Sequence, residues 1–125
     1  MHRVQVILLA AVASVLPACG GPQPGDSCDQ TGFLCVDGSS AMECKAGRWT
    51  ILPCRGPNGC KREGDIIKCD MSANNAGDAC ASTAEGKGLC ASGGTATLEC
   101  RQGQLVQTNT CRSCTVSGEQ VLCQP

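Results

Sequence analysis

Cysteine is the residue type that most restricts what this chain can fold into. The sequence contains 13 cysteines among 125 residues, and a content above roughly 8 to 10 % is typical of a disulfide scaffold. Disulfides at this density persist in oxidising compartments, so we predict that the protein is exported. Because the number of cysteines is odd, at least one of them cannot pair within a single molecule.

The apolar residues are too few for an ordinary hydrophobic core. Leu, Ile, Val and Phe supply 14 of the 107 residues after position 18, and Phe33 and Trp49 are the only aromatic residues. This share lies below the roughly 20 % expected of a folded domain. Each disulfide contributes about 2 to 4 kcal/mol by restricting the unfolded chain. We therefore expect several disulfides to replace the missing core.

The first 18 residues have the layout of a signal peptide. Arg3 gives a short basic start, an apolar run extends from Val4 to Leu16, and small residues follow. The run is too short to cross a bilayer comfortably as a permanent helix. The alternative, a buried N-terminal helix, has no apolar surface downstream to pack against. We therefore predict that residues 1–18 are a cleaved signal peptide.

The end of this segment, Leu16-Pro17-Ala18-Cys19, resembles the lipobox of bacterial lipoproteins. In that motif a leucine lies three residues before the cysteine, and a small residue lies directly before it. The resemblance implies cleavage before Cys19, a thioether from its sulfur to diacylglycerol, and a further acyl chain such as palmitate on the new amino terminus. Cys19 is thus predicted to be the unpaired cysteine.

Lipidation of Cys19 implies that a lipid bilayer is the first partner of the chain. Two or more acyl chains give lasting attachment, whereas one binds only marginally. In many lipoproteins an aspartate directly after the cysteine favours retention in the inner membrane, and this chain has Gly20 there. The resemblance therefore implies a lipid-anchored protein of the cell envelope, in the outer membrane, on its periplasmic or surface face.

The other twelve cysteines fall into an internal repeat, which is the signature of a duplicated unit. The sequence "GDSC" at 25–28 matches "GDAC" at 77–80, and "MECKAGRW" at 42–49 matches "LECRQGQL" at 98–105. We interpret the repeated Gly-Asp as a turn capped by the Asp side chain. The chain then divides into the signal peptide (1–18), the lipidated cysteine with a linker (19–24), a first Cys-rich module (25–70), a connector (71–76) and a second Cys-rich module (77–125).

Local patterns within each module favour short strands. "GRWTILP" and "GQLVQTNT" place β-favouring residues after Gly turns, and "VDGSS" and "REGDII" have the composition of hairpin bends. No stretch of ten residues has helical apolar spacing. The predicted fold class is therefore small, disulfide-rich and mainly β, with two tandem modules of three or four short strands each.

The spacing of six cysteines does not decide among their 15 possible pairings. We predict that all disulfides close within a module. Our hypothesis for the last two cysteines of each module is that they pair across a hairpin, Cys60 with Cys69 and Cys114 with Cys123, because a Gly-containing turn separates them. The predicted disulfide cysteines are Cys28, Cys35, Cys44, Cys54, Cys60, Cys69, Cys80, Cys90, Cys100, Cys111, Cys114 and Cys123.

The residue content argues against an enzyme, a metal site and a cofactor. The only histidine is His2, inside the predicted signal peptide, so no imidazole remains for catalysis. "CRSC" at 111–114 has the spacing of a thiol oxidoreductase or half a zinc site, but its counterpart "CRGPNGC" at 54–60 is longer, which indicates structural cysteines. The mature chain has 9 basic and 11 acidic residues, so nucleic acid is not an expected partner.

Three residues are candidates for binding a partner. Arg55 and Arg112 each follow the fourth cysteine of their module, where small disulfide-rich proteinase inhibitors present a preorganised residue. Trp49 could form the centre of a carbohydrate-binding surface, since the six-cysteine unit is loosely similar to peritrophin-type chitin binders. The doubled unit resembles the Cys-rich repeats of bacterial surface lipoproteins without known activity. The predicted function is non-enzymatic, structural or recognitive, with an unknown protein or surface polymer as partner; a proteinase inhibitor and a carbohydrate-binding module are the alternatives.

Overall fold

The computed structural model describes residues 21–125. The predicted signal peptide and Cys19 lie outside the described residues. Strands dominate, and the one helical element in this range is the 3-10 turn η1 (Ser82–Ala84), so the prediction of a small, disulfide-rich, mainly β fold is confirmed. The strands are β1 (Phe33–Asp37), β2 (Ser40–Lys45), β3 (Arg48–Pro53), β4 (Cys60–Glu63), β5 (Ile66–Cys69), β6 (Gly88–Cys90), β7 (Ala96–Arg101), β8 (Gln104–Thr110), β9 (Ser113–Ser117) and β10 (Gln120–Gln124).

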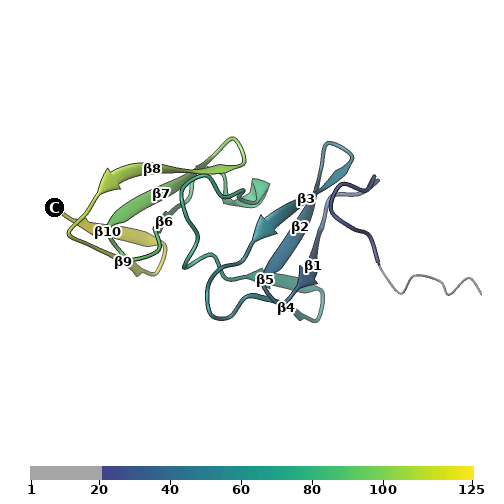
Figure 1. The fold of residues 1–125 in the computed structure, drawn as a ribbon, viewed down its shortest axis with the longest axis horizontal. Coiled ribbons are helices and arrows are strands. Elements are labelled where there is room, and N and C mark those ends of the chain that lie inside the picture. Colours follow the sequence, from purple (N-terminus) through teal and green to yellow (C-terminus); the bar gives the residue numbers. More distant parts are fainter. Residues whose placement is uncertain (1–20) are drawn as a thin grey trace, which may run out of the picture.

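The two modules have the same topology. Each contains a three-stranded antiparallel sheet, β1-β2-β3 or β6-β7-β8, followed by a two-stranded hairpin, β4-β5 or β9-β10. The modules lie end to end along the long axis of the molecule (Figure 1). Each module therefore has five strands rather than the expected three or four, because the terminal hairpin is added to a full three-stranded sheet.

The central hairpin of each sheet turns on a residue pair with positive φ. Ala46 and Gly47 have φ angles of 48° and 77° between β2 and β3, and Gln102 and Gly103 have 52° and 78° between β7 and β8. Two consecutive positive φ angles produce the turn whose twist matches that of antiparallel strands. The glycine in "AG" and "QG" supplies the conformation at the second position without steric cost. The strands predicted after these glycines are observed.

Six disulfides hold the fold, and every one of them closes within a module. In both modules the first cysteine pairs with the third, the second with the fifth and the fourth with the sixth. The bonds join Cys28 to Cys44, Cys35 to Cys60, Cys54 to Cys69, Cys80 to Cys100, Cys90 to Cys114 and Cys111 to Cys123.

The pairing predicted inside each terminal hairpin, Cys60 with Cys69 and Cys114 with Cys123, is wrong. These cysteines do lie opposite each other in their hairpins, but their sulfurs bond to cysteines outside the hairpin. Main-chain hydrogen bonds already hold the two hairpin strands together, so an internal disulfide would add no link to the rest of the module. The observed bonds instead attach each hairpin to its three-stranded sheet.

The sheet of the first module is apolar on both of its faces. Opposite partners in an antiparallel sheet share a face, so Leu34, Met42 and Ile51 lie on one side, together with Trp49, which is opposite Cys44. We call Leu34, Met42, Trp49 and Ile51 the outer apolar face. The other side carries the buried Ala41, Leu52, Cys54 and Cys60, which pack with Ala79 and Ala81 of the second module. The core of the first module is thus continuous with the contact between the modules.

Candidate interaction surfaces

The connector at 71–76 is part of the packed structure. Asn74 is completely buried, its side-chain amide donates to the carbonyl of Pro53 at 2.8 Å, and its side-chain oxygen accepts from the Arg55 amide at 3.0 Å. On the other side, its carbonyl accepts from the Ser92 amide at 3.2 Å. Asn74 therefore links both modules. No pattern in the sequence identifies Asn74, because its buried partners are main-chain groups that no side-chain pattern reveals.

Arg55 joins the first module to the second through an ion pair. Its guanidinium donates two hydrogen bonds to the Asp78 carboxylate, at 2.8 and 3.0 Å. The Asp78 oxygen that accepts from Arg55 Nε also accepts from the Asn75 main-chain amide at 2.9 Å. Asp78 therefore also caps the Gly-Asp turn, as Asp26 does by accepting from the Gln23 amide at 2.8 Å. The predicted turn cap is observed in both modules. In this ion pair, Arg55 stabilises the contact between the modules. Its side chain would have to leave Asp78 before it could enter the pocket of a protease.

The hydrogen bond from Arg55 holds the pKa of Asp78 below its ordinary value, against burial, which raises it. A lowered pKa means that the pair stabilises the fold above the unfolded pKa, about 3.9, and that this contribution is lost as the pH falls through the lower, folded value. We expect Asp78→Asn to lower the urea midpoint at pH 7 and to differ progressively less from wild type toward pH 2. Asp26→Asn is the control, since it makes the same change in the matching turn cap, which has no arginine partner; an equal effect of both variants at pH 7 would contradict the role of Arg55.

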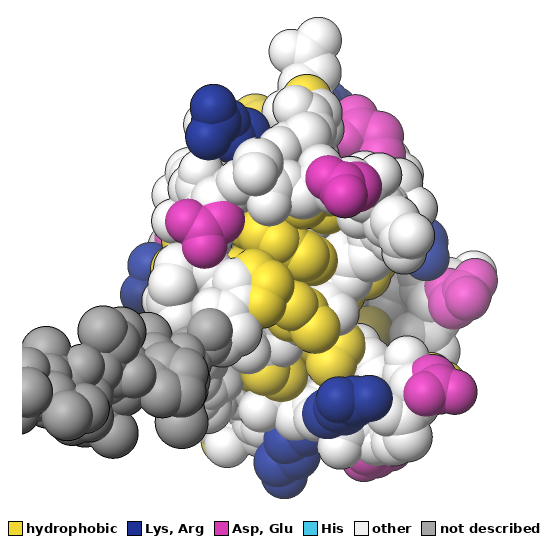
Figure 2. Space-filling model, turned by 90° about the vertical axis from the view of Figure 1, so that its right-hand side faces the viewer, with side chains coloured by type: hydrophobic (Ala, Val, Ile, Leu, Met, Phe, Trp, Pro, Cys, Tyr) yellow, Lys and Arg dark blue, Asp and Glu magenta, His cyan; other side chains and the backbone are white. Residues whose placement is uncertain are grey.

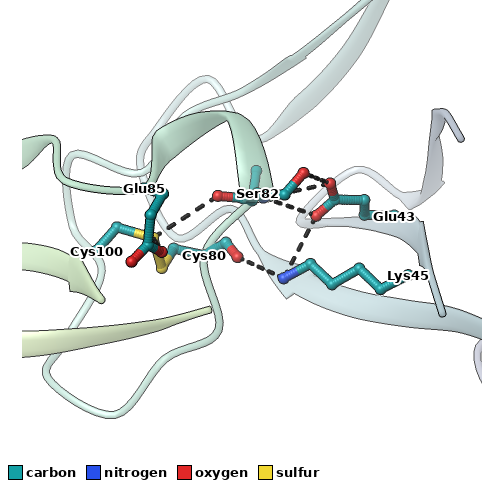
Figure 3. A network of polar contacts seen from close by, with 7 residues as sticks. Glu43, Lys45, Cys80, Ser82, Glu85 and Cys100 are labelled. Atoms are coloured by element: carbon teal, nitrogen blue, oxygen red, sulfur yellow. Dashed lines mark hydrogen bonds and ion pairs between the residues drawn. A yellow bond between two sulfur atoms is a disulfide. The ribbon is translucent and has the colours of Figure 1, made fainter. Parts of the chain in front are cut away.

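A second polar contact between the modules is centred on Glu43 (Figure 3). Glu43 is only 4 % exposed. Its carboxylate accepts from the Ser82 amide at 3.0 Å and from the Ser82 hydroxyl, and it pairs with Lys45 at 3.4 Å. Lys45 in turn donates to the carbonyl of Cys80 at 2.8 Å. A carboxylate buried at this depth is costly unless it is paired, and here residues of both modules satisfy it.

The second module repeats this charge pair on β7. Glu99 and Arg101 occupy the repeat positions of Glu43 and Lys45 and form an ion pair at 3.0 Å. Arg112, the counterpart of Arg55, is exposed, and its side chain has no ion-pair partner in the part of the chain that the structure describes. Of the two arginines considered for an inhibitory loop, Arg112 is therefore the accessible one.

Trp49, the third predicted binding residue, lies on β3 beside a shallow groove. The groove is lined by Pro22, Leu34 and Trp49, with polar residues from 27 to 32. Ile51, on the same strand, is 47 % exposed. Figure 2 shows that hydrophobic side chains form a continuous band on this end of the molecule, with charges of both signs around it. The sequence marked Trp49 alone, whereas the register of the sheet adds Leu34 and Ile51 to its surface, with the buried Met42 between them.

Cys111 and Cys114 have a structural role. Their sulfurs belong to two different disulfides, with Cys123 and with Cys90. Among residues 21–125 there is no group of three or more His, Cys, Asp or Glu side chains placed to hold a metal ion. No helix in the same range is both long and apolar enough to cross a membrane.

Comparison of the chain with protein-family models, with curated proteins and with solved structures finds no match.

Proposed function

We propose that this protein is a membrane-anchored lipoprotein of the cell envelope, attached through acylated Cys19, with a non-enzymatic structural or recognition role. The anchor is the diacylglyceryl thioether and the acylated amino terminus implied by Leu16-Pro17-Ala18-Cys19. The outer membrane is the proposed location, because Gly20 follows the cysteine. The two modules, joined by the contacts of Arg55 with Asp78 and of Glu43 with Ser82, are held at the membrane by the short segment before residue 25.

The observation that carries this proposal is the assignment of the cysteines. Twelve of the 13 are consumed in six disulfides that close within the modules. The remaining one is Cys19, the residue that the lipobox resemblance marks for lipidation. Twelve paired cysteines also fit export to an oxidising compartment. A recognition role is supported by the small size of the modules, whose disulfides fix loop conformation and thereby lower the entropy lost on binding.

The replacement Cys19→Ser tests the anchor. In a bacterium that processes lipoproteins, we expect the wild-type chain in the detergent-soluble membrane fraction. The Cys19→Ser variant should lack lipid and retain residues 1–18, because the lipoprotein peptidase acts only after the cysteine is modified. Both forms should have no free thiol, because Cys19 is a thioether in the wild type and absent from the variant, and the other twelve cysteines are paired in modules that fold independently of the anchor. A Cys19→Ser chain with the same lipid content as wild type would disprove the proposal.

A further inference from the structure

The two modules differ in what covers the same face of their sheets. In the second module the counterparts of Met42 and Trp49 are Leu98 and Leu105, each 1 % exposed, and Met71 and Ala84 pack against them. The connector, through Met71, and the η1 turn, through Ala84, thus cover this face of the second module. In the first module Met42 is buried too, at 2 % exposed, but Trp49 and Leu34 are only partly buried and Ile51 is 47 % exposed.

The two modules also differ in the polarity of the residue at the Ile51 position of the repeat. In the register of β7 with β8, the residue opposite Leu98 is Gln107, whereas the residue opposite Met42 is Ile51. The module with a covered face has the polar residue at this exposed position, and the module with an open face has the apolar one. Exposed apolar surface that is continuous with Leu34 and Trp49 marks a contact surface rather than a scattered residue.

The chain enters the first module beside this face. The Gly25 amide donates to the carbonyl of Trp49 at 2.7 Å, as the Gly77 amide does to the carbonyl of Leu105. Pro22 lines the groove that contains Trp49 and Leu34. Cys19 lies three residues before Pro22, a span of at most about 11 Å at roughly 3.3 to 3.6 Å per residue. A lipid on Cys19 must therefore enter the bilayer close to the edge of the outer apolar face.

We propose that the outer apolar face rests on the lipid bilayer, at the boundary between headgroups and acyl chains. This inference depends on the proposed function, because it takes the acyl chains on Cys19 to bring the bilayer within reach. Trp49 has the amphipathic ring that is enriched at this depth, and apolar faces that lie in the interface penetrate about 5–10 Å. The mature chain has 9 basic and 11 acidic residues, so the contact is apolar and does not require anionic lipid.

This contact fixes the orientation of the whole protein. The second module extends from the first along the long axis, away from the outer apolar face (Figures 1 and 2). With that face on the bilayer, the end that carries the C-terminus points away from the membrane (Figure 1), and Arg112 lies at this end because its amide donates to the carbonyl of Gln124 at 2.6 Å. The bilayer thereby replaces the cover that the connector gives the second module, and the exposed Arg112 end is the one presented to other molecules.

Trp49 is the only tryptophan in the chain, so its fluorescence reports this contact alone. The test uses the chain of residues 19–125, which contains every described residue, coupled through the Cys19 thiol to a maleimide phospholipid in phosphatidylcholine vesicles. Chemical coupling separates this test from natural lipidation, whose failure is detected by the mass of the natural protein. We expect a blue shift of Trp49 emission and quenching by phospholipids brominated near the headgroup, more than by those brominated near the chain end. Anionic lipid should not change the result.

Ile51→Asp should reduce the quenching, because it places a charge in the centre of the face, while the variant stays coupled to the vesicles. Leu122→Asp is the matched control: Leu122 is 48 % exposed, on the far module, and its replacement should leave the quenching unchanged. A count of free thiols verifies that each variant is folded. Emission equal to that of the uncoupled chain would overturn the proposal. A blue shift that grows with protein density on the vesicles, with no quenching by bromine, would also overturn the proposal. In that case a second copy of the protein, and not the bilayer, would cover the face.

Discussion

Replacement of both Cys80 and Cys100 by alanine is expected to lower the free energy of unfolding of the second module by about 3 to 5 kcal/mol. The bond closes a loop with a sequence separation of 20 residues, and the lost loop-closure constraint alone corresponds to about 3 kcal/mol. Both cysteines are 0 % exposed and pack with Leu98 and Leu105, so their removal also leaves a cavity. Urea unfolding of the oxidised protein measures the loss.

The pair Cys111 and Cys123 provides the comparison within the same module. Its bond spans 12 residues, and Cys123 is only partly buried. The double alanine variant should therefore lose about 2 to 3 kcal/mol, less than the Cys80 and Cys100 variant. If the two variants were equally stable, burial of the Cys80–Cys100 bond would contribute nothing, and the core assigned to the second module would be incorrect.

Glu43→Ala is expected to have the largest effect of any single charge replacement. The Ser82 amide and hydroxyl lose their acceptor, and Lys45 loses its ion-pair partner. Hydrogen bonds to a charged group contribute about 1.5 to 3 kcal/mol. We expect a loss of this size, measured by urea unfolding, and faster hydrogen exchange of the Ser82 amide. Faster hydrogen exchange at the Ser82 amide would show that the contact between the modules opens in the Glu43→Ala variant.

Glu99→Ala is the matched control for Glu43→Ala. Glu99 occupies the same position of the repeat and also pairs with a basic residue, but its side chain is 32 % exposed and bonds to no residue of the other module in the described range. Its ion pair with Arg101 is solvated, so removal should change stability little. A loss as large as that of Glu43→Ala would contradict the view that Glu43 acts through Ser82.

The sequence predicted the fold class because that class depends on local patterns. Neighbouring residues encode each of its features: the turns at 46–47 and 102–103, the Asp caps at 26 and 78, and the repeated set of six cysteines. The disulfide pairing could not be predicted in the same way, since Cys60 and Cys69 are opposite each other in a hairpin and still bond to other strands. Connectivity depends on how the hairpin packs against the sheet.

The residues between the modules were missed for a related reason. Glu43 lies in a short strand, where an acidic side chain is normally solvated, and here it is buried in contact with Ser82 of the adjacent module. Its repetition as Glu99, followed in both modules by a cysteine and a basic residue, is the signal that could have identified it. Asn74 had no such signal, because it occurs in the connector alone.

Mass spectrometry of the amino-terminal peptide of the mature wild-type protein decides whether Cys19 is the lipid anchor. We expect a peptide that begins at Cys19 and carries diacylglycerol on its sulfur and an acyl chain on its amino group, with no free thiol elsewhere under denaturing conditions. An unmodified Cys19, or a Cys19 in a disulfide with a second chain, would contradict it, because the odd cysteine would then join two molecules instead of holding one to a membrane.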